Sequence, residues 1–243
     1  MSDHIRRILV VDDDVDACQN LRDILTDRDY AVEIAHSGEE ALAWIERQPF
    51  DVVLLDLRMP GMDGIACYRR LRQARPETVS ILITAYASKE AEQEAEFAGV
   101  ARVLSKPVDL RRLLPMIDTA VRQPLLLVVD DDTDLCESLW DILRDQGYRV
   151  SLAGSVSEAS RRLHDRSFDG VLIDLRLPDG YGVSIAQQVQ ATMPEAHVVL
   201  MTGYGKELRE IVGDMGLPPP ECVRGKPIDI PRLLADLRRV TTQ

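Results

Sequence analysis

Short apolar runs alternate along the chain with segments whose apolar residues recur every three or four positions. The short run is typical of a buried strand, and the second spacing is that of one helix face. In the first half, strands are expected at 8–11, 31–35, a run ending at Asp56, 79–84 and 101–104. A helix is expected after each strand, and the last three of these helices cover about 64–73, 89–98 and 109–121.

The second half repeats this pattern. Its strands are expected at 125–129, 149–153, a run ending at Asp174, 197–202 and near 222–223. A glycine-broken helix to about Met215 and three prolines at 218–220 precede the fifth strand, and the last helix covers 229–240. Strands that alternate with helical crossovers predict an α/β fold with a parallel, doubly wound sheet in each half. The linker is Gln123-Pro124 alone, so we expect two domains in tandem, 1–122 and 123–243.

Helix starts are marked in both halves. Ser37 and Ser155 each precede a glutamate by three positions, which is the pattern of a capping box. Asp14 and Asp132 end the two acidic triplets, and we expect them to cap the first helix of each half.

The net charge of −12 is shared equally between the halves. Residues 1–122 contain 16 Lys and Arg against 22 Asp and Glu, and residues 123–243 contain 13 against 19, so each half has a net charge of −6. Two acidic surfaces argue against binding to nucleic acid or to an anionic membrane. No apolar run approaches the roughly 18 residues of a membrane span, and the amino terminus has no signal-type apolar region, so a cytoplasmic protein is expected.

The cysteines do not have the spacing of metal ligands or of a secreted disulfide framework. They stand far apart, at Cys18, Cys67, Cys136 and Cys222. Cys18 and Cys136 occupy matching helical positions, and we expect both to be small buried residues.

Polar residues follow four of the expected strands in each half. In the first half they are Asp12 and Asp13, Asp56, Thr84, and Lys106 before a proline. Because the carboxyl ends of parallel strands meet at one edge of a sheet, these side chains are expected to share a pocket. The second half has the same set, 118 residues further on and 120 for the lysine: Asp130, Asp131, Asp174, Thr202 and Lys226.

This combination of side chains favours phosphoryl chemistry. Clustered carboxylates repel one another, so they raise a pKa or bind a cation, and a few exposed oxygens favour magnesium completed by water. The chain has only four lysines beside 25 arginines, and two of the four precede proline at matching positions. A compact ammonium suits a single phosphoryl oxygen. A carboxylate beside magnesium, a hydroxyl and an ammonium is suited to accepting a phosphoryl group.

At these residues the chain resembles the receiver domain of bacterial response regulators, the CheY-like family, twice and over almost its whole length. The shared features are the acidic pair, an Asp followed by x-x-Met/Leu-Pro and a later Gly, a strand-end Thr, and Lys-Pro. The resemblance implies two flavodoxin-like (βα)5 domains and a role in two-component signalling or a phosphorelay. It also implies a sensor histidine kinase or a histidine phosphotransfer protein as partner.

The resemblance further implies a role for each matching residue. The phosphoacceptors would be Asp56 and Asp174. Magnesium would be bound directly by Asp13 and Asp131, mainly through water by Asp12 and Asp130, and by the backbone carbonyls of Arg58 and Arg176. The phosphoryl group would accept a hydrogen bond from Thr84 or Thr202 and pair with Lys106 or Lys226, and both Lys-Pro bonds would be cis.

One departure concerns the readout of phosphorylation. The family usually has an aromatic residue three positions before the lysine, and this chain has Val103 and Val223. The segment after Pro227 contains no recognisable DNA-binding or catalytic domain, so output through protein partners or a homodimer is expected from a switch that is not an enzyme.

Two other functions stay open at this stage. One domain would be phosphorylated while the other serves only as an adaptor or dimerisation module. Alternatively, Asp12-Asp13-Asp14 also reads Asp-x-Asp after a strand, as in haloacid-dehalogenase-like phosphatases, although the further acidic cluster of that family is missing after Lys106.

Overall fold

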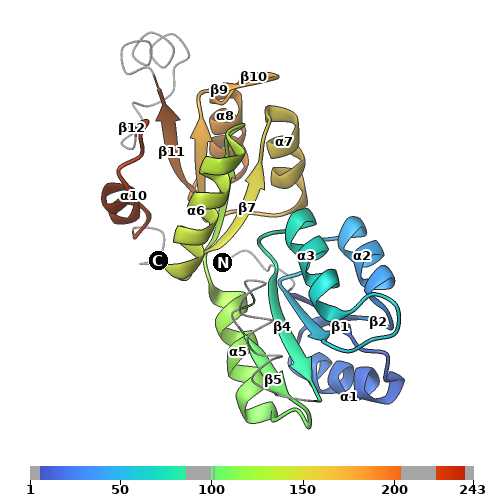
Figure 1. The fold of residues 1–243 in the computed structure, drawn as a ribbon. Coiled ribbons are helices and arrows are strands. Elements are labelled where there is room, and N and C mark those ends of the chain that lie inside the picture. Colours follow the sequence, from blue (N-terminus) through green and yellow to red (C-terminus); the bar gives the residue numbers. More distant parts are fainter. Residues whose placement is uncertain (1–5, 86–99, 101, 204–222, 239–243) are drawn as a thin grey trace. The chain divides into compact units, whose positions relative to one another are not determined.

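The chain forms two compact units, Met1–Gln123 and Pro124–Gln243, each with its own sheet and helices (Figure 1). The division falls one residue after the expected cut between 122 and 123. The structure is a computed structural model that describes residues 6–85, 100, 102–203 and 223–238. The helices expected at 89–98 and before Met215, and the prolines at 218–220, lie outside these residues.

Unit 1 is a five-stranded parallel sheet in the order β2-β1-β3-β4-β5. Its elements match the sequence pattern closely, and the expected strand at 101–104 is found at 103–105. The bounds are β1 Arg7–Val11, α1 Val15–Thr26, β2 Ala31–Ala35, α2 Gly38–Arg47, β3 Val52–Asp56, α3 Gly64–Ala74, β4 Val79–Thr84, β5 Val103–Ser105 and α5 Leu110–Arg122.

Unit 2 has the same topology, with the order β12-β11-β8-β6-β7. It adds a two-stranded antiparallel hairpin, β9-β10, that the sequence pattern did not predict. The bounds are β6 Leu125–Val129, α6 Thr133–Asp145, β7 Arg149–Ala153, α7 Val156–Asp165, β8 Gly170–Asp174, β9 Arg176–Leu177, β10 Gly180–Tyr181, α8 Val183–Thr192, β11 His197–Thr202, β12 Val223–Gly225 and α10 Ile230–Leu237.

The expected helix caps are present. Asp14 accepts a hydrogen bond from Ala17 N at the start of α1, and Asp132 accepts one from Leu135 N at the start of α6. Ser37 accepts from Glu40 N at 3.1 Å, and the Glu40 carboxylate accepts from His36 N at 2.7 Å. Satisfying backbone donors that have no partner inside the helix fixes where each helix begins.

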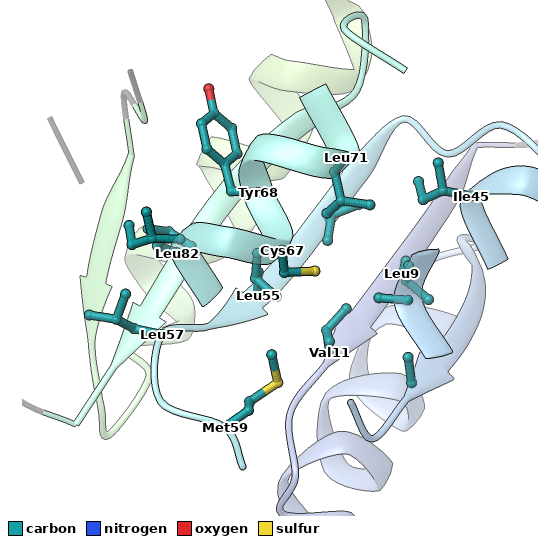
Figure 2. Packing of buried hydrophobic residues seen from close by; sticks show 14 of the residues in the cluster. Leu9, Val11, Ile45, Leu55, Leu57, Met59, Cys67, Tyr68, Leu71 and Leu82 are labelled. Atoms are coloured by element: carbon teal, nitrogen blue, oxygen red, sulfur yellow. The ribbon is translucent and has the colours of Figure 1, made fainter. Parts of the chain in front are cut away.

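Both faces of each sheet are covered, because alternate residues of a strand point to opposite faces. In β3, Val53 and Leu55 pack with α2 and α3, whereas Val52 and Leu54 pack with α1 and α5. Figure 2 shows the first of these two clusters, in which Cys67 and Leu71 of α3 pack against strand residues such as Leu55. The same two-layer arrangement around the sheet recurs in unit 2. This double burial explains why the central strands are almost wholly apolar.

Cys18, Cys67 and Cys136 are free and buried, as expected for Cys18 and Cys136. Among the described residues, no helix is long and apolar enough to cross a membrane.

Candidate functional site

In unit 1, three carboxylates meet at the carboxyl edge of the sheet. Asp12 follows β1, Asp13 is next to it, and Asp56 ends β3, the neighbouring strand. One oxygen of each lies within 4.8 Å of the others, and Asp13 is exposed while the other two are buried. Oxygens this close together can bind one metal ion, with the exposed side open to water.

Lys106 completes this cluster from the turn after β5. Its Nζ lies 2.7 Å from Asp12 Oδ2 and 3.4 Å from Asp56 Oδ2. The strand pairing brings it there, because Lys106 N donates a hydrogen bond to Thr84 O at the end of β4. The peptide bond between Lys106 and Pro107 is cis, and so is that between Lys226 and Pro227, which confirms the prediction.

Unit 2 has the matching cluster. One oxygen each of Asp130, Asp131 and Asp174 lies within 4.8 Å of the others, and again the middle residue is the exposed one. Lys226 Nζ lies 2.7 Å from Asp130 Oδ2 and 2.6 Å from Asp174 Oδ2. Its ammonium is therefore closer to the strand-end aspartate than Lys106 is in unit 1.

Burial and charge set the ionisation of these groups. Burial raises the pKa of Asp56, and the neighbouring Asp12 carboxylate adds to the effect. In unit 2, burial raises the pKa of Asp130, and this effect outweighs the hydrogen bond from Lys226, which lowers it. Burial alone would lower the pKa of both lysines, but their contacts with the two carboxylates in each pocket outweigh it and raise the pKa. Each pocket therefore contains a charged ammonium beside carboxylates whose negative charge is incompletely solvated.

The two predicted threonines lie at the expected strand ends. Thr84 ends β4 and Thr202 ends β11, and both are buried. Each is beside the strand that ends in an aspartate, because Asp56 pairs with Ile83 and Asp174 pairs with Met201.

Arg58 and Arg176 are exposed residues two positions after the strand-end aspartates. Arg176 N donates a hydrogen bond to Asp174 Oδ1 at 3.3 Å, so the backbone of this loop already contacts the carboxylate.

The later glycine of the sequence motif has a steric reason. A Cβ atom on Gly64 would lie 2.3 Å from the carbonyl oxygen of Asp56, and one on Gly182 would lie 2.0 Å from that of Asp174. Gly64 N and Gly182 N instead donate hydrogen bonds to Leu57 O and Leu175 O. The loop after each aspartate can turn into its helix only where no side chain intervenes.

One residue near the site was not predicted from the sequence. Asp179, five positions after Asp174, accepts hydrogen bonds from Val156 N at 2.7 Å and Ser157 N at 2.9 Å. The matching residue of unit 1 is Gly61, which has a φ of 79°. This difference between the halves was one of the sequence signals for the contact.

Val103 and Val223 begin β5 and β12, three positions before the lysines. Val103 is partly buried against the α2 and α3 side of the unit 1 core.

Comparison with known proteins agrees with this geometry. The model of the response regulator receiver domain matches the chain twice, at residues 8–118 and 126–236. A response regulator receiver protein of Anaeromyxobacter sp. (strain Fw109-5) is 34% identical over 239 residues, which cover 97% of this chain and 95% of that protein. The transcriptional regulatory protein ZraR of Salmonella typhimurium is 41% identical over 114 residues, which cover 47% of this chain and 26% of that protein.

Among solved structures, a CheY-like response regulator receiver domain protein from Methanospirillum hungatei JF-1 is 36% identical, with a TM-score of 0.46. The match covers 48% of this chain and 94% of that one. The double match to the family model and the relative that aligns over nearly the whole length decide the assignment. The chain belongs to the response regulator receiver family, and it contains two receiver domains in tandem.

Proposed function

We propose that this tandem receiver protein is a phosphorylation switch that accepts phosphoryl groups on Asp56 and Asp174 from a phosphohistidine donor. The observation that supports this most is the repeated pocket, in which each strand-end aspartate lies beside two acidic residues and a lysine. The donor would be a sensor histidine kinase or a histidine phosphotransfer protein, the proteins that phosphorylate receiver domains in general.

In the transfer step, a carboxylate oxygen of the aspartate bonds to phosphorus while the bond from phosphorus to the donor's imidazole nitrogen breaks. The nitrogen keeps the bonding electron pair, and the aspartate becomes an acyl phosphate. Lys106 or Lys226, now paired with carboxylates, would pair with a phosphoryl oxygen, and Thr84 or Thr202 would donate a hydrogen bond to another. Positioning and charge neutralisation of this kind supply most of the catalysis in phosphoryl transfer.

Magnesium is the cation that we propose for both pockets, because the donors are carboxylate oxygens with an exposed side for water. Its ligands would be Asp13 and Asp131 directly, Asp12 and Asp130 mainly through water, the acceptor aspartates, and the backbone carbonyls of Arg58 and Arg176. A bound magnesium ion would neutralise charge on the phosphoryl oxygens. The raised pKa of Asp56 supports this, since a buried carboxylate near a second one gains most from a cation.

The phosphorylated state would act through protein partners or through self-association as a homodimer. Each half has a net charge of −6, which does not favour binding to the negatively charged backbone of nucleic acid.

The test is phosphoryl uptake from acetyl phosphate with magnesium, counted by intact mass. We expect two groups on the wild type, one on Asp56→Ala, one on Asp174→Ala and none on the double variant. Chelation of magnesium should suppress all uptake. Asp145→Ala, which removes an aspartate whose side chain is 74% exposed and remote from the pockets in sequence, is the matched control and should take two groups.

The outcomes separate the alternatives. A wild type that takes one group, lost only with one of the two aspartates, would make the other unit an adaptor. Steady turnover of a generic phosphate ester without a phosphorylated aspartate would instead favour a phosphatase function. No uptake by the folded wild type at saturating donor would contradict the proposal.

A further inference from the structure

The loop that follows the acceptor of unit 2 is a small hairpin. β9 and β10 pair in an antiparallel manner, with Leu177 opposite Gly180 and Arg176 opposite Tyr181. The turn between them consists of Pro178 and Asp179. No such pairing is present among the described residues of unit 1, where the matching loop contains Gly61.

Asp179 attaches this hairpin to the N-terminus of α7. Its Oδ1 accepts from Val156 N and its Oδ2 from Ser157 N, the first two residues of the helix. These N–H groups have no acceptor inside the helix, and a carboxylate there also interacts favourably with the helix dipole. The hydrogen bonds from Ser157 and Val156 lower the pKa of Asp179, so the carboxylate is charged when it makes this contact.

The remaining donors of this helix start are already satisfied within α7 and its approach. Glu158 N donates to Ser155 Oγ at 3.1 Å, and Gly154 N donates to Glu158 Oε2 at 3.0 Å. Asp179 therefore supplies the acceptors that the capping box leaves out, and the helix start presents two parallel donors to one carboxylate.

Packing supports the same attachment. A Cβ atom on Gly180 would lie 3.3 Å from Val156 Cγ2, so the backbone of the hairpin lies directly against α7 at this position. The hydrogen bonds of Asp179 and the contact of Gly180 thus involve the same residue of the helix, Val156.

The hairpin also reaches the acceptor. Arg176, in β9, donates its backbone N–H to Asp174 Oδ1 at 3.3 Å. The carbonyl of the same residue is the backbone ligand that we propose for magnesium. A fixed hairpin therefore fixes both the N–H that touches the acceptor and the carbonyl that would touch the metal.

We propose that Asp179 is a positioning residue of unit 2, which holds the Arg176 backbone in place around Asp174 by attaching the β9-β10 hairpin to α7. This inference rests on the proposed function, because it assigns Asp179 a role in metal binding and phosphoryl uptake at that pocket. The matching residue of unit 1, Gly61, has no carboxylate.

The test uses the full chain with Asp56→Ala, so that uptake reports Asp174 alone. Asp179→Ala, Asp179→Asn and Val156→Pro are added separately. Proline is favourable at the first position of a helix and suits the extended Ser155 before it, but it removes one of the two N–H donors. Glu195→Gln, which neutralises another exposed carboxylate of unit 2, is the control.

Two quantities are measured on each folded variant: the magnesium concentration that half-saturates the rate of acetyl phosphate uptake, and magnesium affinity by calorimetry. Residues that support metal ligands change affinity by about 10–100-fold. Asp179 acts through the backbone, so a smaller effect is expected. For Asp179→Ala the half-saturating magnesium concentration should rise, and the magnesium affinity fall, by about 3–10-fold. Asp179→Asn keeps one carbonyl acceptor, so its half-saturating magnesium concentration should lie between those of the parent and Asp179→Ala. Val156→Pro should raise this concentration as well, and Glu195→Gln should leave it unchanged.

The failures are distinguishable. If the Asp56→Ala parent takes up phosphoryl groups normally and Asp179→Ala has the same magnesium dependence while losing only thermal stability, Asp179 is a helix cap and the inference is wrong. If the folded parent neither binds magnesium nor takes up a phosphoryl group, the proposed function of unit 2 is wrong and the inference falls with it.

Discussion

The two units share a pocket but differ in how the loop after the acceptor is fixed to the neighbouring helix. In unit 1 a Cβ atom on Gly38, the first residue of α2, would lie 2.9 Å from Met62 Sδ. In unit 2 the matching helix residue is Val156, and the matching loop residue is Gly180. The large and the small residue have exchanged places, so the contact is filled in both units from opposite sides.

The carboxylate of the loop also stands at a different position in the two units and caps a different helix. Asp63 accepts a hydrogen bond from Ala66 N at 2.7 Å and caps α3 in unit 1. The matching residue in unit 2 is Tyr181, which is 56% exposed. The N-cap residue of α8 is Gly182, and no side chain caps this helix. The carboxylate of the unit 2 loop is Asp179 instead, and it caps α7. The loop of unit 1 is therefore fixed to its own helix and by apolar packing, and that of unit 2 by a charged contact to the previous helix.

Each unit has its own fluorescent reporter for testing this comparison. The chain contains two tryptophans, Trp44 in α2 of unit 1 and Trp140 in α6 of unit 2. Trp44 Nε1 donates to Ile34 O at 3.1 Å, and Trp140 is 4% exposed, so both should change emission on unfolding. Replacing one tryptophan by phenylalanine leaves a probe for the other unit.

The largest effect on stability is expected at the glycine that both units have in the loop after the acceptor aspartate. Gly64→Ala and Gly182→Ala should each cost about 3 kcal/mol or more in the stability of their own unit, because the added Cβ meets the acceptor's carbonyl oxygen at 2.3 Å or 2.0 Å. Chemical denaturation followed by Trp44 or Trp140 measures this loss.

Gly203→Ala is the control for that pair of variants. No residue in the described part of the chain lies within 4 Å of its added Cβ, and unit 1 has Ala85 at the matching position. Its cost should stay within about 0.5 kcal/mol. Equal costs at all three glycines would contradict the explanation by the close approach to the acceptor's carbonyl oxygen.

The exchanged contact gives a smaller effect and a sharper test. Gly38→Val alone should cost about 1–3 kcal/mol, because it meets Met62, and Met62→Gly alone should cost a similar amount by removing packing. The double variant reproduces the pair of unit 2, so it should cost at least about 1 kcal/mol less than the sum of the single changes. Urea unfolding followed by Trp44 measures the cycle. Strict additivity would mean that the two positions do not pack against each other.

The sequence predicted what the parallel sheet imposes. Asp56 and Asp174 end their strands, and the two lysines directly follow theirs. The carboxyl ends of parallel strands meet at one edge of the sheet whatever the loops do. Strand limits depend on pairing instead: β5 continues to Ser105 because that residue pairs with Thr84, which no apolar pattern records.

The hairpin and the contact of Asp179 were not predictable from one half alone. A Pro-Asp-Gly run indicates only a turn, and nothing local says which helix its carboxylate caps. The signal lay in three differences between the halves that involve one contact: Gly61 against Asp179, Gly38 against Val156, and Met62 against Gly180.

The smallest effect concerns a core difference, Cys67 in α3 of unit 1 against Ile185 in α8 of unit 2. Burial raises the pKa of Cys67 from 9.0 to about 12. Between these values the unfolded thiol loses its proton and the folded one keeps it, so the folded state binds more protons and stability falls as pH rises. One such group contributes about 1.4 kcal/mol of lost stability per pH unit.

Cys67→Val should therefore reduce the loss of stability in unit 1 between pH 9 and pH 10 by about 1 kcal/mol, and the difference approaches about 1.4 kcal/mol per pH unit at higher pH. The rest of the slope should remain, because burial also raises the pKa of Cys18 to about 11 and that of Tyr30 to about 12. The measurement is urea unfolding followed by Trp44 at pH 8, 9 and 10, and the same series followed by Trp140 is the control, since unit 2 does not contain the substitution. An unchanged slope at Trp44 would mean that the thiol ionises without unfolding, and the packing around α3 in unit 1 would then admit water more readily than its full burial implies.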